Sequence, residues 1–120
     1  MQSAAQAYGN VARQTSSPRE LEAHLLLQAA SRLQAVHDAW DNEQLNAALL
    51  YNRKLWTIFL TTVTDASNPL PAEIRQNVAN IGIFVMNHTL ATLADPRPEQ
   101  LNSLIRINRE LAAGLMAKAA

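Results

Sequence analysis

The sequence predicts an all-α protein: a small helical bundle of four main helices plus a short N-terminal arm or helix. Apolar residues recur at steps of three and four along four long segments, which is the spacing that keeps residues on one face of an α-helix. Breaks rich in proline separate several of these segments, and no alternating strand pattern occurs. The chain has 120 residues, 48% of them hydrophobic, which suits one domain with a single core.

Composition and charge disfavour a nucleic-acid partner. Lys and Arg total 10, as do Asp and Glu, so the formal net charge is +0, and no basic stripe of the kind that binds phosphates is present. The chain has no cysteine, which excludes disulfides and thiolate chemistry. The N-terminus lacks the basic and apolar regions of a secretory signal. We therefore expect a cytoplasmic protein.

The first sixteen residues are predicted to form a loosely held arm, because they are small and polar. A helix is then predicted to begin at Ser17-Pro18-Arg19-Glu20. Ser17 fits the N-cap, Pro18 the first helical position and Glu20 the capping-box position. An apolar stripe follows to about Trp40. We accordingly divide the chain into an arm, residues 1–16, and a single helical bundle domain, residues 17–120.

The second helix is predicted from about Glu43 to Thr64, where its apolar stripe ends before a break at Asn68-Pro69-Leu70-Pro71. The fourth helix follows the break Asp95-Pro96-Arg97-Pro98 and continues to about Lys118, because prolines fit the first turn of a helix.

The third helix, from Ile74 to Leu93, is predicted to be the central helix of the bundle. No charged residue lies between Arg75 and Asp95, and apolar residues occur on several sides. A helix of this kind must be covered on several sides by its own protein, so we expect the other helices to surround it. Its asparagines, glutamine and histidine argue against a membrane span.

No residue pattern indicates catalysis. The three histidines, His24, His37 and His88, are not spaced as a metal pair on a helix, and we expect His88 to lie in or near the core with a hydrogen-bond partner. Gly82 and Gly114 fall inside predicted helices, which indicates close helix crossings. We expect no enzyme, no cofactor and no metal.

Asparagines interrupt the apolar faces, and they allow two interpretations. Asn52 and Asn108 lie inside apolar stripes, and Asn77 and Asn80 flank another. Because an unpaired buried carboxamide costs about 1–3 kcal/mol, the interpretation that we favour is an internal polar network that fixes helix register. In the alternative, a groove that accepts a partner's helix or backbone is lined by Asn52, Arg53, Trp56, Asn80, Asn108 and Arg109.

Five blocks of sequence, in order, carry a family resemblance. They are Pro18-Arg19-Glu20-Leu21-Glu22, Asn52-Arg53-Lys54-Leu55-Trp56-Thr57-Ile58-Phe59, Asn68-Pro69-Leu70-Pro71, residues 75–85 and Leu104-Ile105-Arg106-Ile107-Asn108-Arg109. Together they make the chain similar to the bacterial flagellar biosynthesis regulator family FlaF, from Ala7-Tyr8 to Gly114-Leu115.

The resemblance implies a cytoplasmic chaperone that binds newly made flagellin and promotes its synthesis and secretion for filament assembly, opposite a second regulator, FlbT. An alternative is a post-transcriptional regulator of flagellin mRNA that acts with or against FlbT and has no flagellin groove of its own. A third is a structural dimer, so both a monomer and a homodimer remain open. We expect no direct nucleic-acid contact and no membrane contact.

A flagellin-binding role suggests how the candidate residues would act. Amphipathic flagellin termini would lie in a groove beside the second to fourth helices. Trp56 and Phe59 would be the apolar anchors, while Arg53, Arg75 and Arg109 would make polar contacts.

Overall fold

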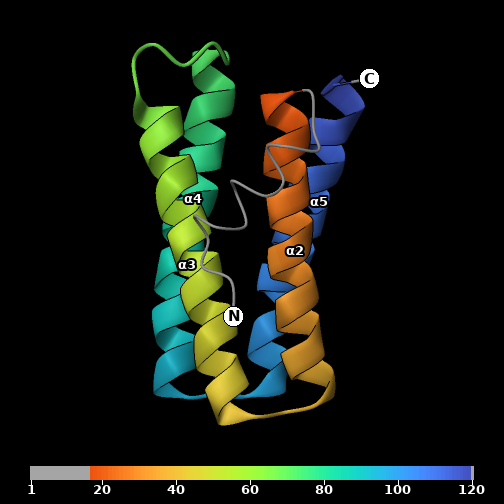
Figure 1. Cartoon of the computed structure of the whole chain (residues 1–120). Coiled ribbons are helices and arrows are strands. Elements are labelled where there is room, and N and C mark those ends of the chain that lie inside the picture. The colour runs from red at the N-terminus through yellow and green to blue at the C-terminus, as the bar shows by residue number, and fades with distance from the viewer. Residues whose placement is uncertain (1–16, 120) are drawn as a thin grey trace.

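The computed structural model describes residues 17–119, which form four α-helices and one short 3₁₀ turn. The helices are α2 (Pro18–Asp38), α3 (Asn42–Thr64), α4 (Ala72–Ala94) and α5 (Asn102–Ala119), with the turn η1 (Pro98–Leu101) before α5. Each helix runs opposite to the one before it (Figure 1). No strand occurs in this range, so the predicted all-α bundle of four main helices is confirmed. The predicted arm, residues 1–16, lies outside the described residues.

Local capping explains where the first two helices begin. Ser17 is the N-cap of α2, and its Oγ accepts a hydrogen bond of 3.1 Å from the Glu20 N–H. Asp41 caps α3 by accepting from the N–H groups of Glu43 at 2.8 Å and Gln44 at 3.2 Å. These carboxyl and hydroxyl oxygens satisfy backbone donors that have no partner within the helix.

The helices pack as two antiparallel pairs. α2 packs most closely against α5 and α3 most closely against α4, while the α2–α3 contact joins the pairs (Figure 1). Most of the buried hydrophobic side chains belong to α2 and α3, with Leu104, Ile105 and Ala112 from α5. α2 is covered on several sides, because its buried residues include Ala23, Leu26 and Ala30, which lie off the predicted apolar stripe.

The prediction that the third helix is central is wrong. α4 packs mainly on α3, and its buried residues are Gly82, Val85, Thr89 and Thr92. Ile83 and Leu90 are 55% and 58% exposed. α4 has apolar residues on several sides, but it packs mainly against one helix, α3, because α2 and α5 pair with each other. Its lack of charge therefore marks an outer surface.

The two glycines in the helices of residues 17–119 differ. A Cβ atom built on Gly82 would lie 2.5 Å from Leu60 Cδ2 and 2.9 Å from Leu60 Cγ, so α3 and α4 are close there. This confirms the predicted crossing at Gly82. The crossing predicted at Gly114 is wrong, because Gly114 is exposed and no described atom lies within 4 Å of a Cβ built there.

None of the helices between residues 17 and 119 has an apolar stretch long enough to cross a membrane.

Alanine at the two glycines should have opposite effects. Gly114→Ala should raise the free energy of unfolding by about 0.5–1 kcal/mol, because alanine favours a helix and meets no neighbour. Gly82→Ala should lower the free energy of unfolding by about 1–2 kcal/mol, since the cost of displacing the Leu60 side chain exceeds the gain in helix propensity that alanine brings. Urea unfolding followed by circular dichroism measures both. Equal stabilisation by the two changes would contradict the close approach of α3 and α4.

Candidate functional site

Asn52, Trp56 and Asn108 form a hydrogen-bonded network in the core. The Trp56 Nε1–H donates to Asn108 Oδ1 at 3.0 Å, and Asn108 Nδ2 donates to Asn52 Oδ1 at 2.7 Å. All three residues are 0% exposed. The network joins α3 to α5, and thereby connects the α3–α4 pair to the α2–α5 pair.

The asparagines divide between interior and surface. Asn52 and Asn108 have the internal pairing that the favoured interpretation predicts. Asn77 and Asn80 are exposed, and the Asn80 Oδ1 accepts a hydrogen bond from Gln76 Nε2 at 3.0 Å. The network also has one open end, because Asn52 Nδ2 is buried without a partner among the described residues.

Alanine substitution should distinguish the members of this network. Asn108→Ala should lower the free energy of unfolding by about 2–4 kcal/mol, because it leaves Trp56 Nε1 and Asn52 Oδ1 unpaired beside a cavity. Asn52→Ala should lower the free energy of unfolding by at least about 1 kcal/mol less than Asn108→Ala does, since it also removes the unpaired Asn52 Nδ2. The exposed control Asn80→Ala should stay within about 0.5 kcal/mol of the parent. Denaturant unfolding of all three measures this order, and a costlier Asn52→Ala would contradict the bonding scheme.

The eight candidate partner-binding residues do not line one groove. Asn52, Trp56 and Asn108 are buried in the network, while Arg53, Asn80 and Arg109 are exposed. Phe59 is 7% exposed and lies edge-on to the Trp56 ring, with centroids 5.6 Å apart. That any of the eight contacts a partner stays a prediction.

Arg75 has a structural contact with the loop before α4. Its Nε donates to the Leu70 carbonyl at 3.2 Å and its Nη1 to the Asp65 carbonyl at 3.4 Å. The guanidinium therefore holds the α3–α4 loop against the start of α4.

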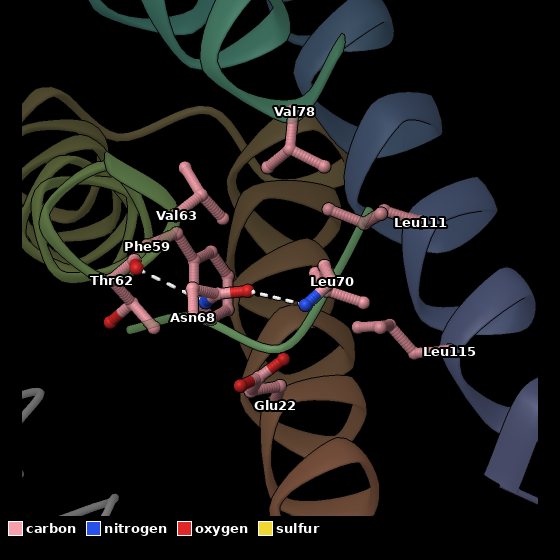
Figure 2. A pocket seen from close by; sticks show the side chains of 9 residues that line it. All are labelled: Glu22, Phe59, Thr62, Val63, Asn68, Leu70, Val78, Leu111 and Leu115. Atoms are coloured by element: carbon pink, nitrogen blue, oxygen red, sulfur yellow. Dashed lines mark hydrogen bonds between the residues drawn. The ribbon is translucent and has the colours of Figure 1, made fainter. Parts of the chain in front are cut away.

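A groove lies at the end of the bundle where this loop meets α2 and α5. Its inner part, of about 50 Å³, is shown in Figure 2 and is lined by Glu22, Phe59, Thr62, Val63, Asn68, Leu70, Val78, Leu111 and Leu115. An adjoining outer part of about 510 Å³ shares several of these residues and adds Ser17, Pro18, Arg19 and Pro69. We call the two parts together the end groove.

Hydrogen bonds of Asn68 shape the end groove. Asn68 Nδ2 donates to the Thr62 carbonyl at 3.1 Å, and the Leu70 N–H donates to Asn68 Oδ1 at 3.0 Å (Figure 2). These bonds fix the loop so that Leu70 forms part of the apolar wall. The sequence showed this break but not that it would border a groove.

Glu22 is the only charged residue in the lining of the inner part of this groove. The residue is half-buried, and burial raises the pKa of its carboxyl group, while the nearby Arg19 partly offsets this effect. No hydrogen bond or ion pair from residues 17–119 reaches the carboxylate. A carboxylate in this position is a polar acceptor in apolar surroundings.

Glu22 should make stability depend on pH. Its pKa is higher in the folded than in the unfolded chain, so the folded state binds more protons and the free energy of unfolding falls as pH rises through these pKa values. Glu22→Gln should therefore raise the melting temperature at pH 7 and have little effect near pH 3. Thermal melts across pH measure the difference, with exposed Glu110→Gln as the control for loss of a negative charge. If Glu22→Gln raised the melting temperature equally at pH 7 and near pH 3, that result would contradict a pKa of Glu22 raised by burial.

The outward face of α4 is the second notable surface. Its exposed apolar side chains are Ile83 (55%), Phe84 (47%), Leu90 (58%) and Leu93 (43%), and Gln76, Asn80 and Asn87 are exposed uncharged residues. No charged residue lies between Arg75 and Asp95. Ile83 and Leu90 lie on one side of the helix because they are seven positions apart, with Phe84 and Leu93 flanking them. Exposed apolar residues grouped in this way often mark sites of protein contact.

His88 fixes the C-terminal half of α4. Its Nε2 lies 2.6 Å from the Gln100 carbonyl and 3.2 Å from Ser103 Oγ, and its ring stacks on Phe84 at a centroid distance of 5.3 Å. The half-buried histidine therefore has the hydrogen-bond partner that we predicted. It also holds the exposed Phe84 ring against a fixed neighbour.

No metal centre is evident in the described range, where no group of three or more His, Cys, Asp or Glu side chains could hold an ion. That the chain has no enzymatic activity and needs no cofactor stays a prediction.

Residues 17–119 thus define the class of small antiparallel four-helix bundles, with a helix that exposes uncharged and apolar side chains and a groove at one end. The family model described as "FlaF: Flagellar protein FlaF" matches residues 4–115. The chain belongs to this family, which relates it to the flagellum and confirms the resemblance found in its sequence blocks. No curated protein and no solved structure matches the chain significantly.

Proposed function

We propose that this protein is a cytoplasmic chaperone that binds unassembled flagellin and promotes its synthesis and secretion. Its family membership supports the link to the flagellum. The observation that carries the binding proposal is the outward face of α4, where Ile83, Phe84, Leu90 and Leu93 are exposed without a nearby charge on the helix.

The α4 face has the chemistry to hold an amphipathic helix. Ile83 and Leu93 are separated by about 15 Å along the helix axis, which corresponds to nearly three turns of a client helix. A flagellin terminal segment with an apolar stripe would bury that stripe against α4, and each Å² of buried apolar area contributes about 25 cal/mol. Because a disordered client loses entropy when it becomes ordered, the net affinity is moderate.

This proposal changes the expected contact residues. Trp56 cannot be an apolar anchor without opening the core, because it is 0% exposed and hydrogen-bonded to Asn108. Phe84 and Leu90 take that role in the proposal. Phe84 suits it, because its ring is stacked on His88 and loses little side-chain freedom on binding.

Isothermal titration with monomeric flagellin tests the proposed function. We expect saturable binding to full-length flagellin. Binding should be lost when the terminal segment of flagellin that contacts α4 is deleted. If the folded protein binds neither form, the proposal is wrong. That result would favour the alternative regulator, which acts on flagellin mRNA with or against FlbT.

A pair of leucine substitutions tests the surface itself. Leu90→Glu should weaken flagellin binding at least about tenfold, equivalent to about 1.4 kcal/mol, because it places a charge in the apolar contact. Leu50→Glu is the matched control, since Leu50 is 50% exposed on α3 beside Arg53 and Lys54. Titration with flagellin measures both, and circular dichroism checks folding. Equal weakening by the two variants would exclude α4 as the specific contact.

A further inference from the structure

The end groove borders the first residues that the structure describes. Ser17, Pro18 and Arg19 line its outer part, so the sixteen preceding residues are attached at its rim. A segment of nine extended residues spans about 30 Å, and the longest extent of the described structure is 39 Å. Tyr8 can therefore reach any part of the groove. Attachment at the rim also gives the segment a high effective concentration there.

The lining specifies what an occupant must offer. The inner walls are apolar, with Phe59, Val78 and Leu115 among them, and Glu22 provides a carboxylate that no residue in the range 17–119 pairs (Figure 2). A matching group needs an apolar body and one hydrogen-bond donor. A tyrosine side chain has both, because its ring is apolar and its hydroxyl group donates.

We propose that residues 1–16 dock into the end groove of their own chain, with Tyr8 as the anchor and its hydroxyl group donating to the Glu22 carboxylate. Tyr8 is the only aromatic residue of this segment. The FlaF match begins at residue 4, so the segment that contains Tyr8 is part of the family pattern. The docked segment covers Leu70 and Leu115 and completes the core at this end of the bundle.

This role is separate from the proposed binding of flagellin. The end groove is formed by α2, α3, α5 and the α3–α4 loop, with Val78 as the contribution of α4. The exposed residues on the outward face of α4 do not line it. Docking of the segment can therefore hold or fail whether or not flagellin binds to α4.

Disulfide trapping tests the docking directly, because the chain has no native cysteine. Ala7→Cys leaves Tyr8 intact, and Thr62→Cys places the second thiol in the lining of both parts of the groove. The control pair is Ala7→Cys with His24→Cys. His24 is exposed and lies two positions beyond Glu22 on α2, which is about 200° around the helix. Mass spectrometry and non-reducing gels at low protein concentration measure the rate of disulfide formation within one chain.

We expect the Thr62 pair to form at least tenfold faster than the His24 pair. Adding Tyr8→Ser should remove that difference, Tyr8→Phe should keep part of it, and Gln6→Ser should leave it unchanged. Equal rates for the two pairs would overturn the proposal, as would an unchanged rate after Tyr8→Ser. Disulfides that form only between two chains would also overturn it, since the occupant would then be the segment of a second copy.

Discussion

The hydrogen bonds among Asn52, Trp56 and Asn108 determine how the two helix pairs fit together. α3 and α5 have few close backbone contacts, yet these three buried side chains connect them across the core. Apolar burial is non-directional, whereas a buried amide that loses its partner costs about 1–3 kcal/mol. The network therefore selects one register of the α3–α4 pair against the α2–α5 pair. The positions of the outward face of α4 and of the end groove depend on this register.

The close pairing of α2 with α5 leaves α4 at the edge of the bundle. α4 is held by its contact with α3 at Gly82 and by His88, which bonds to η1 and α5. These contacts use one side of the helix and leave Ile83 and Leu90 exposed. An edge helix that is fixed but not covered offers a rigid apolar surface, and a rigid surface loses less entropy when a partner binds. The proposed flagellin contact thus follows from the way in which the core is shared among the helices.

Local sequence rules predicted the helices better than their arrangement. Ser17 and Pro18 identified the start of α2, and the proline breaks identified the loops on either side of α4, because capping and proline geometry act over a few residues. The buried asparagines were evident as interruptions of apolar stripes, although the hydrogen bond that Trp56 donates to Asn108 joins residues 52 positions apart. The place of α4 was predicted wrongly, because an apolar pattern shows which sides need cover but not which helices provide it. The end groove was missed, since it requires Asn68 to fix the loop beside α2.

The most direct test of the α4 surface is methyl NMR of the protein with labelled Ile and Leu methyl groups, titrated with a peptide of a flagellin terminal segment. We predict that the methyl signals of Ile83, Leu90 and Leu93 shift or broaden in a saturable manner, while that of the exposed Leu50 does not. Leu25 and Leu33, which are buried in α2, should also keep their signals. Changes confined to Leu70 and Leu115 would place the client in the end groove and contradict the assignment of α4 as the binding surface.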